Sequence, residues 1–325
     1  MESVIVTGGA GFIGSFLCEE LIRRGFYVVA IDNLFRGKIE NLKSIINHKN
    51  FKFVKMDLSG SIDFDLLMDV PKPVSILFHL AAINGTQYFY DIPFKVLDIN
   101  TRITQNVLRI VEFLDAKYIV YTSSSEVYGD PIKIPTPEDH PILLNIFSMR
   151  DSYASSKAIG EFYIKLFCEK KKIPYLILRV FNLYGERMQT SKYGQVIPEF
   201  IKRALLEDNF YIIGDGSNTR SFCYIKDAVE LMVKMVEMRL SDVINLGNDE
   251  EISIIELAKR IHRIIGREFK PSFLPPRPFD HKRRRPDISK LRSLFKDFNF
   301  TPLDVGLNKT IEFYKNLKDE GSSGK

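Results

Sequence analysis

The 325-residue chain has few cysteines, and Cys18, Cys168 and Cys223 stand far apart with no CxxC pair among them. This spacing excludes a disulfide framework and offers no zinc-binding pattern, so we predict no metal site. Because free thiols persist in reducing compartments, the sequence favours a cytoplasmic location.

Long apolar runs are also missing. No run approaches the roughly 18 residues of a membrane-spanning helix, and Val4-Ile5-Val6 is typical of a buried strand rather than of a signal peptide. The 46 basic and 41 acidic residues are spread along the chain, apart from short basic runs at residues 170–172 and 282–285. These features predict a soluble protein that binds neither a membrane nor nucleic acid.

What the chain does have is 45% hydrophobic residues, arranged as short β-branched runs that alternate with longer amphipathic stretches. This alternation is typical of parallel strands joined by crossover helices, so we predict an α/β fold. Strands are expected at residues 3–7, 27–32, 51–55, 75–79, 118–123 and 175–179.

Beyond about Phe181 the alternation loosens, which indicates a second, smaller lobe. A proline-rich stretch at residues 271–286 precedes the last expected helix, and residues 319–325 read as a flexible tail. In this half we expect helices at residues 197–207, 226–238, 254–265 and 307–317 and strands at residues 210–213 and 243–246.

A GxxGxxG motif follows the first expected strand at Gly8, Gly11 and Gly14, and Phe12 and Ile13 open the next helix. Free N–H groups and the dipole at a helix N-terminus bind a pyrophosphate. Gly8 permits the tight turn, Gly11 lets the backbone approach phosphates, and Gly14 lets helix and strand pack closely. The motif predicts a dinucleotide site, with an ordinary glycine-rich turn as the alternative.

Acidic residues follow the second and third expected strands. Asp32 is placed to accept hydrogen bonds from an adenosine ribose, which favours NAD over NADP. Arg36 lies close enough to receive a 2′-phosphate instead. Asp57 is expected either to face the adenine or to cap the end of its strand.

Tyr153 and Lys157 are four residues apart in an expected helix, so both side chains project from one face. A phenol has a pKa of about 10, but a neighbouring ammonium and a cationic nicotinamide both stabilise the phenolate. Tyr153 is then able to remove a hydroxyl proton while hydride leaves the same carbon. YxxxK is also a common surface pair, but residues 121–129 place hydroxyls and an acid at a strand's C-terminal end, where open α/β sheets bind ligands.

Six segments carry a family resemblance: TGGAGFIG from Thr7, HLAA from His79, SSSEVYG from Ser123, YASSK from Tyr153, RVFNLYG from Arg179 and TRSFCYIKD from Thr219. Between Val4 and about Tyr314 the chain resembles the extended short-chain dehydrogenases/reductases, in the branch of NAD-dependent nucleotide-sugar epimerases, dehydratases and decarboxylases. The resemblance implies a Rossmann-type doubly wound parallel sheet in residues 1–180 that binds NAD and carries the catalytic residues. It also implies a smaller mixed α/β lobe in residues 181–318 that binds the nucleotide sugar.

The resemblance further implies residue roles. Tyr153 is the expected base, Lys157 orients the nicotinamide ribose, and Ser124 relays the sugar's proton, with Ser125 and Glu126 beside them. The cofactor is expected to contact Tyr153, Lys157 and the glycine motif with Phe12 and Ile13. The other expected cofactor-binding residues are Asp32, Asn33, Asp57, Leu58, Leu80, Ala81 and Ala82. The expected substrate-binding residues are Thr86, Arg150, Asn182, Val196, Arg220 and Arg284; Asn182 would lie against the diphosphate, and the last two arginines are either phosphate ligands or surface residues.

Oxidation of a sugar's C4′ hydroxyl to a ketone activates the neighbouring carbons, so several reactions share this first step. Ser125-Glu126, Arg150 and the KRRRPDISK segment resemble UDP-glucuronate decarboxylases. Ala-Ser-Ser between Tyr153 and Lys157 instead resembles epimerases and dehydratases, Met149 stands where the decarboxylases have proline, and residues 83–86 match no subgroup.

We therefore expect decarboxylation of UDP-glucuronate to UDP-xylose, with 4-epimerisation of UDP-glucose or UDP-glucuronate as the alternative. A 4,6-dehydratase is disfavoured because the Asp of its Asp-Glu pair is absent. A non-catalytic NAD-binding protein is disfavoured because Tyr153 and Lys157 are both present. The family also implies a homodimer built from the helix that follows Asn100 and the helix that carries Tyr153.

Overall fold

The computed structural model describes residues 1–189, 195–206, 209–276 and 280–322, with the side chains of the last helix described as far as residue 317. Its centre is a seven-stranded sheet in the order β11-β6-β5-β4-β1-β2-β3, and every pairing in it is parallel. The order of β1 to β6 is that of a Rossmann sheet, which confirms the predicted fold class. The strands are β1 (Ser3–Thr7), β2 (Tyr27–Asp32), β3 (Phe51–Lys55), β4 (Ile76–His79), β5 (Ile119–Ser124), β6 (Tyr175–Val180) and β11 (Asp242–Leu246).

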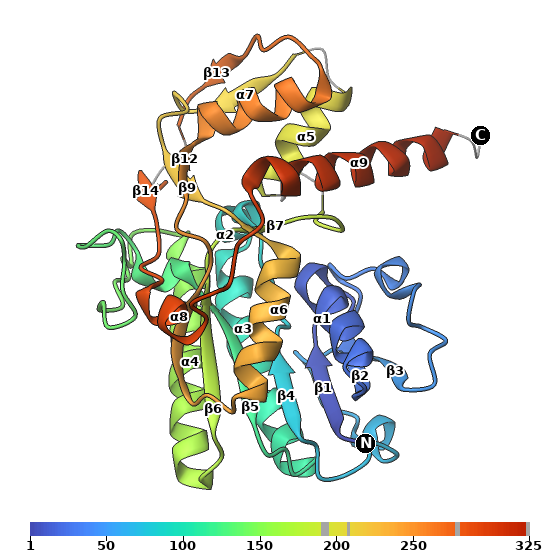
Figure 1. The fold of residues 1–325 in the computed structure, drawn as a ribbon. Helices are drawn as coiled ribbons and strands as arrows, with labels where there is room; N and C mark the ends of the chain where they lie inside the picture. Colours follow the sequence, from blue (N-terminus) through green and yellow to red (C-terminus); the bar gives the residue numbers. More distant parts are fainter. Residues whose placement is uncertain (190–194, 207–208, 277–279, 323–325) are drawn as a thin grey trace.

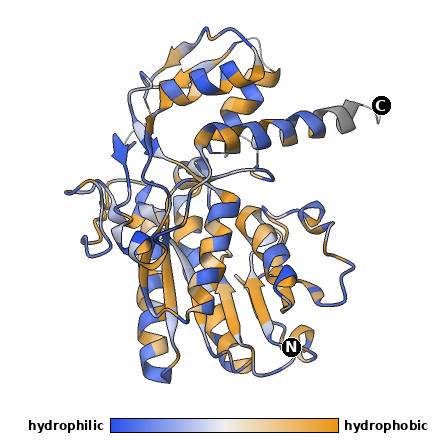
Figure 2. Cartoon of the chain, viewed as in Figure 1, coloured by the Kyte–Doolittle hydropathy of each residue, from blue (hydrophilic) through white to orange (hydrophobic). Residues whose placement is uncertain are grey.

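Helices cover both faces of this sheet. On one face lie α1 (Phe12–Arg23) and α6 (Ile225–Glu237), which contact each other, and on the other α3 (Pro93–Phe113) packs along α4 (Asp151–Lys171). Val4 and Val6 belong to the hydrophobic core under α1, whereas Ile5 belongs to the core under α3 and α4. Because successive strand residues enter different cores, these strands are continuous apolar runs rather than alternating ones (Figure 2).

The smaller lobe lies above the C-terminal ends of the sheet strands in Figure 1. Its helices α5 (Val196–Leu206), α7 (Ile254–Ile265) and α9 (Leu303–Ser322) contact one another. Its short strands are β8 (Tyr211–Ile213) paired with β13 (Ser272–Leu274), and β9 (Thr219–Ser221) between β12 (Glu251–Ser253) and β14 (Arg283–Arg284). The remaining elements are η1 (Ile39–Leu42), η2 (Phe64–Leu67), α2 (Thr86–Asp91), η3 (Ser125–Tyr128), β7 (Leu183–Tyr184), β10 (Cys223–Tyr224) and α8 (Ser289–Leu294).

The structure corrects the predicted boundary after residue 180. The chain enters the smaller lobe there, but α6 and β11 return to the large sheet, where β11 pairs with β6. A boundary in sequence therefore does not separate the two lobes. The last helix begins at Leu303 and continues to Ser322, so residues 319–322 are helical rather than a flexible tail. The rest of the predicted tail lies outside the described residues. The same holds for residue 207, where the helix predicted from residue 197 was expected to end.

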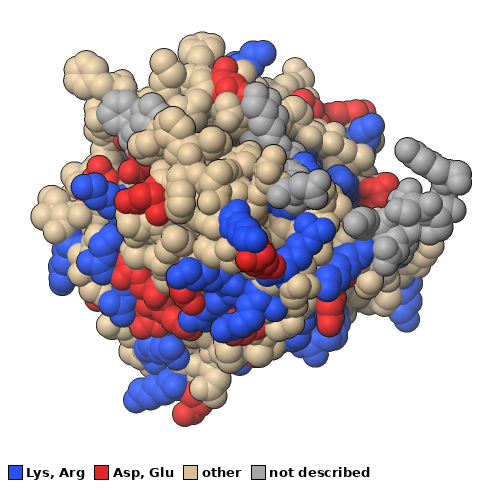
Figure 3. Space-filling model, turned by 90° about the horizontal axis from the view of Figure 1, so that it is seen from above, with Lys and Arg blue, Asp and Glu red and all other residues tan. Residues whose placement is uncertain are grey.

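Charge is mixed over the surface. On the face seen from above in Figure 3, Lys and Arg side chains are interspersed with Asp and Glu side chains. Among the described helices, none is both long and apolar enough to cross a bilayer. This agrees with the even spread of charge and the short apolar runs of the sequence.

A buried ion pair fixes α4 against the sheet. Arg179 on β6 donates from Nε and Nη2 to the two carboxylate oxygens of Glu161 on α4, at 2.9 and 2.8 Å. The Ser123 hydroxyl, on β5, donates to the same carboxylate at 2.5 Å. The pair ties α4, which carries Tyr153 and Lys157, to the ends of two strands.

We expect Arg179→Met to lower the free energy of unfolding by about 3–5 kcal/mol, because it leaves the Glu161 carboxylate buried without its ionic partner. The matched control is Arg102→Met, which removes an i,i+4 ion pair with Asp98 whose side chains are 52% and 41% exposed. We expect a change within about 0.5 kcal/mol there. Urea unfolding followed by circular dichroism measures both, and equal effects would contradict a stabilising role for the buried pair.

Candidate active site

Two adjoining cavities open at the C-terminal ends of β1, β2, β4, β5 and β6. The first, which we call the glycine cavity, has a volume of about 440 Å³, and the second, the tyrosine cavity, about 300 Å³. Phe12, Ile13, Leu80 and Ala82 line both, so a ligand is able to extend from one into the other. The glycine cavity is also lined by Gly8, Gly11, Gly14, Asp32, Asn33, Asp57, Leu58 and Ala81, and the tyrosine cavity by Thr86, Ser124, Ser125, Glu126, Arg150, Tyr153, Lys157, Asn182, Val196 and Arg220.

The glycine cavity fits a dinucleotide. Helix α1 begins after Gly11 without a side-chain cap, so its first N–H groups are available to a phosphate. A Cβ atom at Gly14 would lie 2.1 Å from the carbonyl oxygen of Gly8, and one at Gly8 would lie 2.9 Å from the nitrogen of Ala81. The glycines therefore allow a close packing of turn, helix and strand that no larger residue permits, which is the arrangement that NAD requires.

Acidic residues occupy the far end of this cavity. The carboxylate of Asp32 accepts hydrogen bonds from the backbone nitrogens of Ala10 and Leu34, at 3.1 and 2.8 Å, and is oriented by them at the end of β2. Asp57 accepts from the backbone nitrogen and hydroxyl of Ser59, both at 2.8 Å, so it caps the turn after β3 and lines the cavity as well. The guanidinium of Arg36 lies 5.5 Å from the ring centre of Tyr88.

Tyr153 lines the tyrosine cavity and is 5% exposed. Its ring stacks on that of Phe89, with 4.6 Å between ring centres and 15° between the planes, and Ser124 lines the same cavity. Burial, followed by the charge of Glu126, raises the pKa of Tyr153 above its ordinary value, while Ser124 and Arg36 oppose the rise. The phenol is thus held in place but is protonated in this state of the site.

Lys157 lies one helical turn after Tyr153 on α4 and lines the same cavity. Its ammonium donates to the carbonyl oxygen of Thr122 at 2.8 Å and lies 5.9 Å from the ring centre of Tyr153. Burial lowers the pKa of Lys157 to about 7, and Glu161 opposes this shift. The ammonium is thus anchored to β5 beside the ring of Tyr153, and its predicted stabilisation of the phenolate, together with a cationic nicotinamide, stays a prediction.

Glu126 is the centre of an ion-pair cluster beside Tyr153. Arg150 binds its carboxylate through two hydrogen bonds of 3.0 and 2.9 Å, and Arg284 forms an ion pair with the same carboxylate. Burial opposes ionisation, but the charges of Arg150 and Arg284 outweigh it and hold the pKa of Glu126 well below its ordinary value. Glu126 is thus a buried anion in the wall of the tyrosine cavity.

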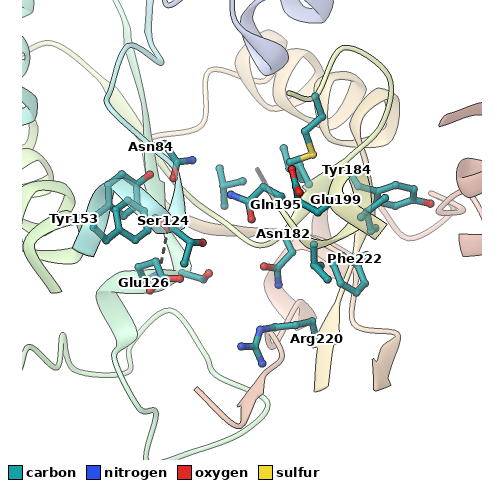
Figure 4. A pocket seen from close by; sticks show the side chains of 18 of the residues that line it. Asn84, Ser124, Glu126, Tyr153, Asn182, Tyr184, Gln195, Glu199, Arg220 and Phe222 are labelled. Carbon is teal, nitrogen blue, oxygen red and sulfur yellow. Dashed lines mark hydrogen bonds between the residues drawn. The ribbon is translucent and has the colours of Figure 1, made fainter. Parts of the chain in front are cut away.

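Across this cavity from Tyr153 and Ser124 lie Asn182 and Arg220 (Figure 4). Arg220 donates to Asp280 at 3.1 Å, and Asp280 also lies 3.4 Å from Arg150. Sequence reasoning missed Asp280, because a single acid in a proline-rich stretch belongs to no motif. With Arg284, three guanidinium groups face two carboxylates in this cluster, which leaves a positive excess suited to an anionic ligand.

Arg284 corrects a second prediction. It lines neither cavity, is 3% exposed, and donates to the carbonyl oxygen of Gly129 at 3.3 Å in addition to pairing with Glu126. Burial lowers the pKa of Arg284 to about 10. Because β14 pairs with β9 in a register that sets Arg284 beside Arg220, its side chain lies behind Glu126. Arg284 is therefore neither a surface residue nor part of a cavity wall in this structure, and it holds Glu126 from behind.

The Ala-Ser-Ser segment after Tyr153 lies away from both cavities. The Ser156 hydroxyl donates to the carbonyl oxygen of Tyr153 at 2.7 Å and accepts from Asn100 on α3 at 3.1 Å. Met149 is 62% exposed and lines neither cavity. These departures from the decarboxylase pattern therefore concern helix packing and the surface, not the walls of the site.

The chain is similar to proteins that act on nucleotide sugars. It is 34% identical to UDP-glucuronic acid decarboxylase 1 of Danio rerio, over 96% of this chain and 72% of that protein. It is 32% identical to UDP-N-acetyl-alpha-D-glucosaminuronate decarboxylase of Bacillus cytotoxicus, over 97% of this chain and 98% of the other. The solved structure of UDP-glucuronic acid 4-epimerase from Bacillus cereus, in complex with UDP-glucuronic acid and NAD, matches with a TM-score of 0.86 and 30% identity, covering 97% of this chain and 99% of that one.

A family model agrees with the geometry of the glycine cavity. The model of the NAD dependent epimerase/dehydratase family matches residues 4–247, which include the glycine motif, β5 with the residues that follow it, and the Tyr153–Lys157 pair. The Rossmann order of strands, the uncapped α1 and the relatives described above point the same way. The chain therefore belongs to the NAD-dependent epimerase/dehydratase family.

Proposed function

We propose that this enzyme decarboxylates UDP-glucuronate to UDP-xylose through a 4-keto intermediate. The observation that carries the proposal is the Glu126 anion, held by Arg150 and Arg284 in the wall that also presents Tyr153. The decarboxylases among its relatives support the same function, since one is named for UDP-glucuronic acid and another for UDP-N-acetyl-alpha-D-glucosaminuronate.

In this proposal the substrate diphosphate binds on the Arg220 side of the tyrosine cavity. Arg220 shares its charge with Asp280 and keeps donors for a phosphate, since a guanidinium carries five N–H groups. Asn182, whose amide donates to the carbonyl oxygen of Ser221 at 3.1 Å, lies on the same wall. The sugar then lies between this wall and Tyr153.

NAD, when bound, supplies an acceptor for the hydride that leaves C4′, and its cationic ring favours negative charge nearby. Tyr153 takes the proton of the C4′ hydroxyl, and we assign the orientation of that transfer to Ser124, which lines the same cavity. The stacked Phe89 keeps the phenol in one position and excludes water from its face. Lys157 is held by the carbonyl of Thr122 and is the group that we assign to orienting the nicotinamide ribose.

Oxidation at C4′ turns the C5 carboxylate into a β-keto acid. The bond between C5 and the carboxyl carbon then breaks, carbon dioxide leaves, and the electron pair is shared by C5 and the C4′ oxygen. A proton adds to C5 to give the pentose, and hydride returns to C4′. Glu126 faces this part of the cavity and is the group that we assign to proton transfer at C5.

A second candidate, 4-epimerisation, is favoured by one observation. The Bacillus cereus UDP-glucuronic acid 4-epimerase shares the fold at 30% identity, and its substrate retains the carboxylate. An epimerase needs only the oxidation at C4′ and hydride return to the opposite face. Product analysis separates the two reactions.

We also propose a homodimer formed by α3 and α4. Ile159, Phe162 and Leu166 on α4 are 36%, 60% and 60% exposed, and their spacing of three and four residues places them on one helix face. Such an apolar stripe on a helix is typical of an interface with another subunit.

We also propose a cytoplasmic location, which is supported by three cysteines that are free and buried.

The first prediction concerns the product. The purified protein with NAD and UDP-glucuronate is expected to release carbon dioxide and form UDP-xylose, as followed by NMR, and Tyr153→Phe is expected to lower kcat by at least about a hundredfold because it removes the base. Formation of UDP-galacturonate without carbon dioxide would establish the epimerase instead. Retained UDP-glucuronate binding by Tyr153→Phe, measured by calorimetry, shows that the variant is folded.

The second prediction concerns Glu126. Glu126→Gln keeps the size of the side chain but removes the charge that Arg150 and Arg284 neutralise, so the decarboxylation rate is expected to fall by about a hundredfold or more. The exposed Glu40→Gln serves as the control, with no expected change. A Glu126→Gln enzyme that decarboxylates at the wild-type rate would remove Glu126 from the chemistry.

The third prediction concerns assembly. Phe162→Glu together with Leu166→Glu is expected to yield monomers in sedimentation velocity experiments, because two charges cannot be buried in an apolar interface without partners. Met68→Glu is the matched control, since Met68 is 65% exposed and lies on neither helix. An unchanged sedimentation coefficient for the double variant would place the interface elsewhere.

A further inference from the structure

Behind Glu126 lies a histidine that belongs to no motif of the sequence. The imidazole of His281 is almost fully buried, with 7% of its side chain exposed. Its Nδ1 atom lies 2.6 Å from a carboxylate oxygen of Asp130, and its Nε2 atom lies 3.6 Å from Oε2 of Glu126. The ring therefore stands between two carboxylates, one in the wall of the tyrosine cavity and one at the surface.

The two carboxylates differ in their access to water. The side chain of Asp130 is 87% exposed, whereas that of Glu126 is 15% exposed. The order from bulk solvent inward is thus Asp130, His281, Glu126 and the tyrosine cavity. These groups come from three places in the fold: η3, the loop that follows it, and the segment leading into β14.

Decarboxylation creates a need for such a connection. A sugar carboxylate that loses carbon dioxide exchanges a C–C bond for a C–H bond, so each turnover consumes one proton from solvent. The hydride that leaves C4′ returns to it, and the proton that Tyr153 removes from the hydroxyl is also returned. The proton for C5 is the only one that must be supplied from outside, and 4-epimerisation has no such demand.

We propose that His281, held between Asp130 and Glu126, carries the proton consumed in each decarboxylation from solvent to the tyrosine cavity. This inference rests on the proposed decarboxylase function. Asp130 takes a proton from water and passes it to Nδ1 of His281 as the Nε2 proton moves to Oε2 of Glu126, and Glu126 passes a proton to C5 as the C5–H bond forms. Exchange of the remaining ring proton from Nδ1 to Nε2 through water then restores the starting tautomer. Charge and atoms balance, because the substrate carboxylate leaves as neutral carbon dioxide.

The surrounding charges favour this direction of transfer. Arg150 and Arg284 bind Glu126 and make it a weak base at rest, so Glu126 does not retain the proton before the substrate requires it. The anionic enolate that remains after loss of carbon dioxide is a far stronger base than a carboxylate and draws the proton inward. The distance of 3.6 Å between Nε2 of His281 and Oε2 of Glu126 is longer than a hydrogen bond. Catalytic hydrogen bonds are often this long without substrate and shorten when substrate binds.

A small base added to solution tests this assignment. His281→Gly leaves a space next to Glu126, and we expect it to lower kcat for decarboxylation about tenfold to a hundredfold in weak buffer, with KM little changed. Imidazole in the medium is expected to raise kcat of this variant at least about fivefold and to leave kcat of the wild type unchanged. The same variant is expected to show a larger solvent deuterium isotope effect than the wild type.

Two carboxylate variants complete the design. Asp130→Asn should lower kcat in the same direction, whereas the exposed Asp139→Asn, a change of the same kind on the same loop, should not. If His281→Gly is poorly folded by circular dichroism, His281→Gln is measured in its place, with the solvent isotope effect as the readout.

The outcomes are distinct. A wild-type rate in His281→Gly, or a loss that imidazole does not relieve, would overturn the relay while leaving the decarboxylase function intact. If the wild type converts UDP-glucuronate without releasing carbon dioxide, the proposed function fails, and the relay fails with it because no proton is consumed. A pH-indicator dye in lightly buffered solution, which records one proton taken up per carbon dioxide released, separates these cases in the wild type alone.

Discussion

The ion pair between Glu126 and the guanidinium groups of Arg150 and Arg284 is the interaction on which the rest of the site depends. A carboxylate at this depth is tolerable only if opposite charge reaches it, because taking an ion out of water costs several kcal/mol. Here the charge comes from the start of α4 and from β14, both remote in sequence from η3. The two arginines that neutralise the buried Glu126 carboxylate therefore connect the Rossmann sheet to the smaller lobe, at the place where we propose that the sugar binds.

The same low-polarity setting explains the resting state of the catalytic pair. Burial disfavours the charged forms of both Tyr153 and Lys157, so the phenol holds its proton and the ammonium gives its proton up more easily than in water. Neither shift suits a base that works alone. A positive charge that enters beside Tyr153 opposes the upward shift of the pKa of the phenol, whereas it adds to the downward shift of the pKa of Lys157. The phenol therefore ionises more readily when the cationic cofactor ring is bound. A site that is inert when empty avoids adventitious chemistry.

Much of the sheet was predictable because its signals are local. The strands at residues 3–7, 27–32 and 51–55 and the helix at residues 254–265 agree with the structure, since each is specified by its own pattern of apolar residues. The glycine motif and the Tyr153–Lys157 spacing likewise depend on neighbouring residues. The return of α6 and β11 to the sheet, the position of Arg284, and the roles of Asp280 and His281 depend on pairings between distant segments, above all β14 with β9, whose two- and three-residue strands carry no periodicity.

The state of the arginines also bears on which reaction the site favours. A guanidinium that pairs with the substrate carboxylate stabilises the ground state and opposes loss of carbon dioxide, which an epimerase of uronates needs. In this structure Arg150 and Arg284 are already engaged by Glu126, and Arg220 shares Asp280. The excess positive charge of the cluster is then left to the diphosphate beside Arg220, while Arg150 and Arg284 are already bound by Glu126. Carbon dioxide, being uncharged, leaves such a wall more readily than a carboxylate remains beside it. Occupied arginines therefore tilt a fold shared with epimerases towards cleavage of the C–C bond.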